Sequence, residues 1–221
     1  MDQTSFCGLP LLTAPGRVMT PRVASEQLVA AALDRIGDRP ARVVDVGTGS
    51  GALAIAIASA APQAMLWATD TSREAVAVAR ANVRRHGLEH RIIVCHGDLL
   101  EPAPNTVDLV VANLPYLPSA EADRFADLAF EPSYAVFASG DGLDPYRRLL
   151  SVLPGRLSTD GAVAIQLHRR VLTTTRDELP RLGAEIEVVQ RRASMGVHMR
   201  GKSELAEEAD RHLEDALLDA A

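Results

Sequence analysis

The sequence predicts an α/β protein with a doubly wound, mostly parallel sheet, and three observations lead to that prediction. Short apolar runs rich in β-branched residues alternate with longer stretches of helical character. These runs are apolar almost throughout, as expected of strands that are buried on both faces of a parallel sheet. Two late runs are separated by a linker too short for a parallel crossover, so we expect them to pair as a terminal antiparallel β-hairpin.

The first forty residues are expected to form an N-terminal arm and a helix. Residues 6–18 have the pattern of a short hairpin or an extended arm. Thr20 and Pro21 predict the start of a helix that runs to about Asp34, because proline suits the first helical turn.

The main domain is expected over residues 41–202, with strands and helices in alternation. The predicted helices share small or apolar residues at helical spacing, and the one over 72–86 has Ser72 as N-cap and Gly87 as the residue after its C-cap. The predicted parallel strands are 42–46, 65–69, 91–95, 107–112 and 162–167; the helices are 51–60, 72–86, 144–153 and 171–182; the hairpin strands are 185–190 and 195–199.

Composition places the chain among ordinary globular proteins. Its 221 residues suit one domain with extensions, and 47% hydrophobic with 24% charged residues excludes general disorder. The longest apolar run, 51–62, is too short for a bilayer span, and the N-terminus lacks the pattern of a secretory signal. The two cysteines, Cys7 and Cys95, are too far apart for a C-x-x-C site. We therefore expect a cytoplasmic protein without a membrane partner or a metal site.

Negative charge is concentrated at the end of the chain. The net charge is −6, and residues 204–221 hold seven acidic residues against one arginine, so the rest of the chain is formally neutral. A neutral body argues against tight binding to duplex DNA. Residues 203–221 also carry apolar residues at helical spacing, for example Leu205, Ala209 and Leu213. They predict an acidic C-terminal helix, which either packs on its own domain or contacts a partner, such as a second copy of the chain.

A glycine-rich turn follows the first predicted strand of the main domain. The motif D-V-G-T-G-S-G spans 45–51, and glycines between a strand and a helix let the backbone approach a ligand closely. Asp70, at the end of the next strand, is placed to bind ribose hydroxyls. Both NAD(P) and S-adenosylmethionine (SAM) fit these two features. The cofactor-binding residues predicted from these strand ends are Asp45, Gly47, Thr48, Gly49, Ser50, Gly51, Asp70, Asp98 and Leu99.

Several of these residues favour SAM. Asp45 precedes the first glycine by two positions, where its carboxylate could meet a ligand's ammonium group. Gly51 completes a G-x-G-x-G array, which differs from the G-x-G-x-x-G pattern that anchors a pyrophosphate. Asp98 ends the third strand at the same sheet edge, and Leu99 beside it could press on a purine ring.

The second motif is Asn113-Leu114-Pro115-Tyr116, after the fourth strand. The Asn113 side chain and a nearby backbone carbonyl can accept the two hydrogens of a planar amide or amine and so aim its nitrogen at a methyl sulfonium. Leu114 precedes a proline and is therefore biased toward an extended conformation that presents its carbonyl. Tyr116 can stack on the planar group. These four residues are the predicted catalytic set.

With these motifs, the chain resembles the class I SAM-dependent methyltransferases of the HemK type, which methylate the glutamine N5 of peptide-chain release factors. The resemblance runs from about Phe6 to Met199 and implies a seven-stranded sheet with SAM at its carboxyl edge. It also implies that Asn113 belongs to the cofactor-binding residues. Besides the two motifs, it is carried by Phe6-Cys7-Gly8, Thr20-Pro21-Arg22, Ser25-Glu26, Leu28-Val29, Glu131-Pro132 and Gly140-Asp141-Gly142-Leu143-Asp144.

The chain also departs from that family in four places, and one is the acidic end beyond Lys202, which has no counterpart there. Leu114 stands where the family has a first proline, and Gln166-Leu167-His168 where it often has glutamate and glycine. Only 44 residues precede Asp45, so we expect the family's helical N-terminal domain to be missing. A glutamine amide in a protein substrate, such as a translation release factor, is the first expectation, and a small partner protein could replace the missing domain. The alternatives are adenine N6 in nucleic acid, a small molecule, and a binding module without activity.

Overall fold

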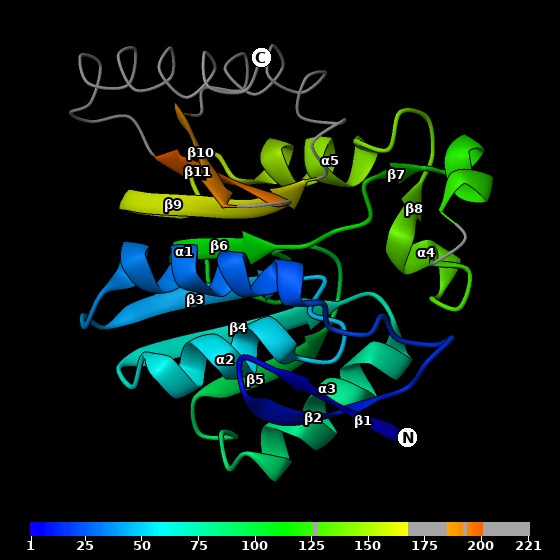
Figure 1. Cartoon of the computed structure of the whole chain (residues 1–221). Coiled ribbons are helices and arrows are strands. Elements are labelled where there is room, and N and C mark those ends of the chain that lie inside the picture. The colour runs from blue at the N-terminus through cyan, green and yellow to red at the C-terminus, as the bar shows by residue number, and fades with distance from the viewer. Residues whose placement is uncertain (126–127, 168–184, 192–193, 201–221) are drawn as a thin grey trace.

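The central sheet has seven strands in the order β10-β11-β9-β6-β3-β4-β5 (Figure 1). The computed structural model describes residues 1–125, 128–167, 185–191 and 194–200. The strands of the sheet are β3 (Ala41–Val46), β4 (Ala64–Asp70), β5 (Ile92–His96), β6 (Val107–Ala112), β9 (Leu157–Leu167), β10 (Glu185–Arg191) and β11 (Ser194–Arg200). Strands β3, β4, β5, β6 and β9 are parallel, and β11 is antiparallel to both β9 and β10. The predicted doubly wound sheet with a terminal hairpin is confirmed.

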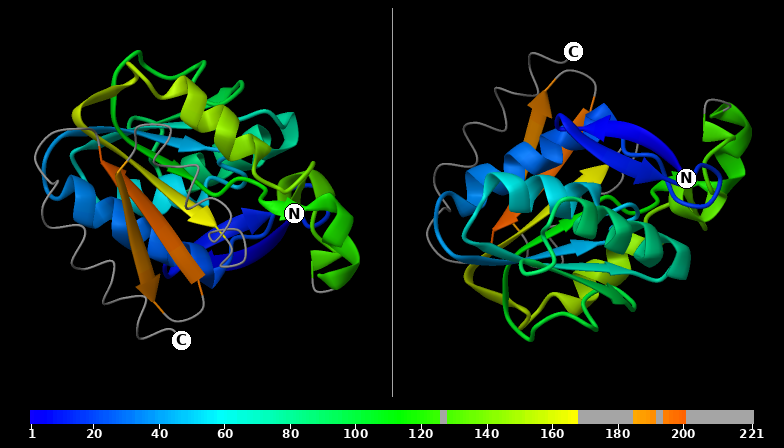
Figure 2. Two further views of the ribbon diagram at one scale, coloured as in Figure 1. Left: turned by 90° about the horizontal axis from the view of Figure 1, so that it is seen from above. Right: turned by 90° about the horizontal axis from the view of Figure 1, so that it is seen from below.

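Helices cover both faces of this sheet, which explains why its central strands are apolar throughout. Side chains of a strand alternate between the faces. In β3, Val43 belongs to the core beneath α1 (Glu26–Ile36), α2 (Ala52–Ala60) and α3 (Arg73–Arg85), whereas Val44 and Val46 belong to the core beneath α5 (Asp144–Val152). Strands β6 and β9 alternate in the same way. Figure 2 shows α1 and α5 on opposite sides of the sheet.

Helix α3 begins and ends as the sequence predicts. The Ser72 hydroxyl caps the helix by accepting a hydrogen bond from the Ala75 N–H at 3.2 Å. Gly87 follows the C-cap with φ +65°, and its N–H donates to the Arg84 carbonyl.

The N-terminal segment is a hairpin docked on α3. Strands β1 (Asp2–Phe6) and β2 (Leu9–Thr13) pair antiparallel through a two-residue turn in which Cys7 and Gly8 both have positive φ. The Asn82 side chain of α3 bonds both the N–H and the carbonyl of Leu12, at 2.7 and 3.0 Å. The expected hairpin is confirmed, although it begins four residues before Phe6.

The predicted start of the following helix is wrong. Residues 20–22 are not helical: Arg22 is extended, a short 3₁₀ turn covers Val23–Ser25, and α1 begins at Glu26. The cause is a distant contact, because the Thr20 N–H donates to the Glu131 carboxylate at 3.0 Å. The segment around Pro21 therefore lies at the carboxyl edge of the sheet and does not form a first helical turn.

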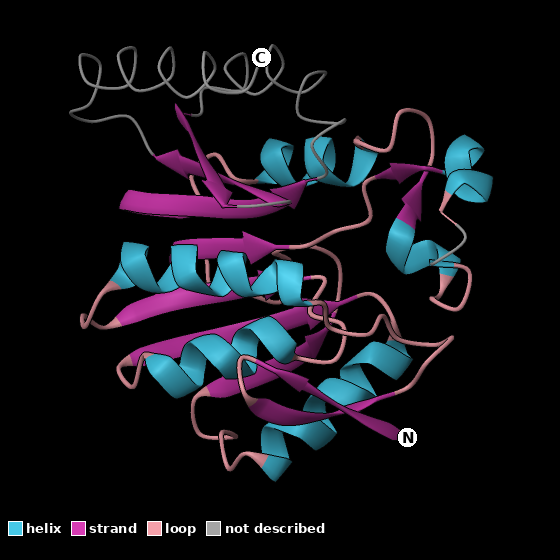
Figure 3. Cartoon of the chain, viewed as in Figure 1, coloured by secondary structure: helices cyan, strands magenta, loops and turns pink. Residues whose placement is uncertain are grey.

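A small unit that the sequence did not predict lies between β6 and α5, beside the carboxyl edge of the sheet (Figures 1 and 3). It consists of β7 (Leu117–Pro118), the 3₁₀ segment Ser119–Arg124, α4 (Ser133–Val136) and β8 (Phe137–Ala138), with β7 and β8 parallel. The predicted helices over 171–182 and 203–221 lie outside the described residues. Within the described part, no helix is long and apolar enough to cross a membrane.

Candidate functional site

A cavity of about 260 Å³ opens at the carboxyl ends of the parallel strands. It lies where β3 is flanked by β4 on one side and β6 on the other, which is the point of an open α/β sheet at which ligands bind. The loops after four strands meet there, joined by the segment before α1. Its lining includes Val18–Arg22, Ser25, Gly47–Ser50, Thr69–Thr71, Gly97–Leu99, Asn113–Pro115, Tyr134, Ala135 and Arg148.

The glycine loop, residues 47–51, turns sharply over the end of β4. The N–H groups of Gly47 and Thr48 both donate to the Thr69 carbonyl, at 2.9 and 3.0 Å. Gly47, Gly49 and Gly51 all have positive φ, which favours glycine. A Cβ on Gly47 would lie 2.7 Å from the Cδ2 of Leu114, which ends a flexible side chain and can move, so the positive φ is the main reason for glycine at this position.

Asp45 lies behind the glycine loop and does not line the cavity. It is fully buried, and one of its carboxylate oxygens accepts from the Thr48 hydroxyl at 2.6 Å and from the Ala54 N–H at 3.2 Å. Burial raises the pKa of Asp45 to about 7. This placement differs from the expected one at a ligand's ammonium group: the carboxylate supports the loop and the start of α2 from below.

The raised pKa of Asp45 predicts a stability that falls as pH rises. Between pH 4 and pH 7 the native carboxyl keeps a proton that the unfolded chain releases, so the native state loses stability across this range, on the order of a few kcal/mol. In Asp45→Asn the amide oxygen can still accept from Thr48 and Ala54 without the charge. We expect the variant's Tm to match that of the wild type at pH 4 and to exceed it at pH 8. Parallel Tm-against-pH curves for the two proteins would contradict this.

Asp70 lines the cavity, and backbone donors hold it there. One carboxylate oxygen accepts from the Gly49 N–H at 2.9 Å and the other from the Ser72 N–H at 2.8 Å. Burial raises the pKa of Asp70, against the lowering effect of these hydrogen bonds. The carboxylate thus joins the glycine loop to the start of α3 and faces the cavity from the end of β4, as expected.

Asp98 and Leu99 line the next part of the wall. Leu99 has φ +47°, and its carbonyl accepts a 2.8 Å hydrogen bond from the Thr69 hydroxyl. Asp98 forms an ion pair with Arg148 of α5, which also lines the cavity. No sequence pattern distinguishes Arg148 from its neighbour Arg147, but Arg147 pairs instead with Asp141 and Asp144.

The acceptor loop, residues 113–116, places three of its four residues on the cavity wall: Asn113, Leu114 and Pro115. The Asn113 amide nitrogen donates to the buried Ser25 hydroxyl at 3.1 Å. Because the nitrogen is engaged, the amide oxygen is the group left to accept a hydrogen from a ligand. In the sequence, Ser25 is only one of the residues that carry the family resemblance, and nothing there predicts its contact with Asn113.

Tyr116 does not line the cavity, in contrast to the expected stacking role. Its ring is half-buried and packs near Leu117 and Val136. Its hydroxyl is hydrogen-bonded to the Gln166 side chain at the end of β9, and burial raises the pKa of Tyr116. The residue therefore fixes the end of the acceptor loop from behind.

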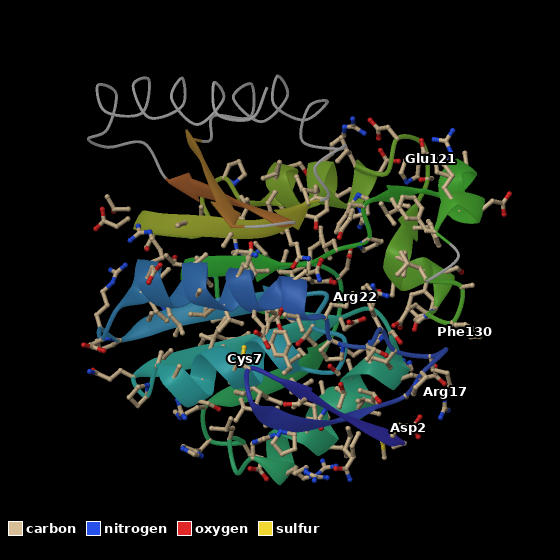
Figure 4. The ribbon with its side chains drawn as sticks, in the orientation of Figure 1. Asp2, Cys7, Arg17, Arg22, Glu121 and Phe130 are labelled. Carbon is tan, nitrogen blue, oxygen red and sulfur yellow. The ribbon has the colours of Figure 1, made fainter. Side chains whose placement is uncertain are left out.

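Glu131 ties the segment before α1 to the unit between β6 and α5. Its carboxylate accepts from the Thr20 N–H and lies 3.8 Å from the Arg22 guanidinium. Close by, the Tyr134 hydroxyl donates to the Arg17 carbonyl, and Figure 4 shows where Arg17, Arg22 and the exposed Phe130 lie. Two motifs more than one hundred residues apart thus form one wall, which local sequence patterns do not predict.

The sequence is similar to a known family of methyltransferases. Residues 23–131 match the family described as "Methyltransferase small domain". A release factor glutamine methyltransferase of Deinococcus radiodurans is 38% identical over 180 residues, which cover 80% of this chain and 64% of that protein. One of Gloeobacter violaceus is 40% identical over 154 residues, covering 68% and 54%. The chain therefore spans less than two thirds of the length of these relatives.

Solved structures share the fold. A ribosomal protein L11 methylase from Lactobacillus delbrueckii subsp. bulgaricus superposes with a TM-score of 0.62 at 23% identity, covering 83% of this chain and 81% of that one. The hMettl16 catalytic domain, solved in complex with the MAT2A 3'UTR hairpin 6, superposes with a TM-score of 0.72 at 16% identity, covering 87% of this chain and 76% of that one. At these identities the likeness concerns the fold alone.

Proposed function

Because the chain belongs to the HemK-type family of class I methyltransferases, we propose that it transfers a methyl group from SAM to a glutamine side-chain amide of a protein substrate. The observation that carries the proposal is the meeting of two loops at one cavity. The glycine loop with Asp70 forms one side, and Asn113 and Leu114 form the other.

The cavity fits SAM by the chemistry of its lining. Gly47 and Gly49 have no side chain to fill the space beside the loop, and Asp70 offers a carboxylate where ribose hydroxyls would donate. Asp98 and Leu99 would hold the purine end, one as a polar partner and the other as an apolar surface. Bound there, SAM supplies an electrophilic methyl group on a sulfonium sulfur.

The acceptor loop provides what a planar nitrogen needs. The nitrogen of an amide is a poor nucleophile because its lone pair is delocalised. The Asn113 amide oxygen and the Leu114 carbonyl can each accept one of its two hydrogens and so direct the nitrogen toward the methyl group. The chain then contributes positioning and exclusion of water. Methyl transfer can precede loss of the nitrogen's proton, which passes to bulk solvent when the product leaves the closed site, so we assign no general base.

Asp70→Asn tests the cofactor half of this proposal. Losing the charge of a hydrogen-bonded carboxylate is expected to weaken SAM binding by about 10–100-fold. Calorimetric titration measures the change. Asp108→Asn is a matched control, since Asp108 pairs with Arg42 on the sheet and does not line the cavity. Equal SAM affinities in both variants, or binding of NAD in place of SAM by the wild type, would refute the assignment.

The protein substrate is proposed from the relatives, which are named as release factor glutamine methyltransferases. A translation factor as substrate would place the activity in the cytoplasm. The test incubates the chain with labelled SAM and, in separate reactions, a bacterial release factor, adenine-containing oligonucleotides and the small-molecule fraction of a lysate. Mass spectrometry should find the methyl group on a glutamine side chain. Label in nucleic acid or in a small molecule would overturn the proposed substrate, and SAM binding without any transfer would indicate a binding module.

A further inference from the structure

A buried tyrosine hydroxyl lies directly behind the acceptor loop. Tyr146 of α5 is 1% exposed, and its hydroxyl is within hydrogen-bonding distance of three backbone groups. The Leu114 N–H donates to it at 3.0 Å, and the carbonyls of Leu114 and Gln166 lie 3.1 and 2.6 Å from it. One side chain thus contacts both polar groups of Leu114, the residue whose carbonyl faces the acceptor in the proposed function.

The Tyr146 hydroxyl can donate only one hydrogen bond, so only one of the two carbonyls receives its hydrogen. A hydroxyl has one hydrogen to donate, and two carbonyls compete for it. The Gln166 carbonyl is closer by half an ångström, so we assign the hydrogen to it. Burial keeps the pKa of Tyr146 well above its ordinary value, so the hydroxyl retains this proton. The Leu114 carbonyl then keeps its lone pairs for a substrate.

The carboxyl end of β9, where Gln166 lies, also holds the other end of the acceptor loop. Gln166 receives the Tyr146 hydrogen on its carbonyl, and its side chain is hydrogen-bonded to the Tyr116 hydroxyl. Leu114 and Tyr116 are therefore both connected to one residue of β9. Asn113 is held separately, through its contact with Ser25.

We propose that Tyr146 is a positioning residue for methyl transfer. Its hydroxyl connects the Leu114 N–H to the Gln166 carbonyl and so fixes the Leu114 backbone. This keeps the Leu114 carbonyl and the Asn113 amide oxygen at the spacing that the two hydrogens of one planar nitrogen require. The inference rests on the proposed function, because it assumes that these two oxygens receive the acceptor.

The test is Tyr146→Phe, which removes the hydroxyl and keeps the ring. The Leu114 N–H then loses its partner, and the loop can shift. Because small displacements of a positioning group can cost as much as 10²-fold, we expect kcat to fall by about 10–100-fold. The Kd for SAM should stay within about twofold, since Tyr146 does not line the cavity. Amide exchange at Leu114, followed by NMR, should become faster.

A control variant separates positioning from stability. Leu149→Ala removes a fully buried side chain from the same helix and the same core, without a hydrogen bond to the acceptor loop. Leu149→Val replaces it if the alanine variant does not fold. The proposal requires that this control keeps kcat within about twofold, even where its Tm falls as far as that of Tyr146→Phe.

Two results would overturn the proposal. One is wild-type kcat in Tyr146→Phe, and the other is a loss of kcat that follows Tm equally in both variants. A failure of the proposed function is a different result: the wild-type chain would then leave glutamine unmethylated. If it methylates another planar nitrogen, the comparison of the two variants on that acceptor still tests Tyr146. If it methylates nothing, unchanged exchange at Leu114 in Tyr146→Phe would refute the connection itself.

Discussion

Asn113→Ala is expected to lower kcat for methyl transfer by roughly 10²–10³-fold, the loss typical of removing one preorganised hydrogen-bonding group at a reacting centre. The Asn113 amide oxygen is the group left free by the bond from its nitrogen to the Ser25 hydroxyl. Alanine removes that acceptor and leaves the glycine loop and Asp70 unchanged. SAM affinity should therefore stay close to that of the wild type.

Steady-state kinetics with labelled SAM and the methyl-accepting protein measure the loss, and calorimetry measures SAM binding. Ser25→Ala is the graded control. It keeps the Asn113 side chain but removes the hydroxyl that orients it, so kcat should fall by less than in Asn113→Ala. A turnover near the wild-type value in Asn113→Ala would remove this residue from the proposed mechanism.

The arrangement of the sheet could be predicted from the sequence because it depends on local signals. Apolar strands, the Ser72 cap, Gly87 and the short link between the last two strands each restrict the chain within a few residues. The glycine loop and Asp70 follow from the same reasoning, since the carboxyl ends of parallel strands meet at one edge of the sheet.

The contacts behind the site could not be predicted, because they join residues far apart in the chain. A local rule placed Pro21 in the first turn of a helix, but the bond between Thr20 and Glu131, 111 residues apart, holds that segment extended. Similarly, no local pattern shows that Tyr146 contacts Leu114, 32 residues earlier. The position of Asp45 in the motif predicts a contact with the ligand, whereas the fold buries this residue behind the loop.

The Gly-Asp-Gly-Leu-Asp element, residues 140–144, shows how such a distant contact can impose a residue type. Gly142 has φ +90°, and a Cβ there would lie 2.3 Å from the backbone oxygen of Tyr116 and 2.9 Å from its carbonyl carbon. Both atoms are backbone, so they cannot move aside as the end of a flexible side chain would. The element therefore requires a glycine where it supports the acceptor loop.

Gly142→Ala is accordingly expected to destabilise the fold by about 2–5 kcal/mol, from the left-handed conformation and the added steric overlap together. Because relief of the overlap must displace the Tyr116 backbone, kcat should also fall by about 10²-fold in the molecules that fold.

Gly155→Ala is the matched control, since Gly155 has φ +76° but no atom within 4 Å of the added Cβ. Gly155→Ala should lower the free energy of unfolding only by the cost of the left-handed conformation, about 1–2 kcal/mol, and kcat should be unchanged. Urea unfolding and kinetics of both variants, below the Tm of the weaker one, give the comparison. If Gly142→Ala behaves like Gly155→Ala in both measurements, the close approach to Tyr116 is not what requires glycine at position 142.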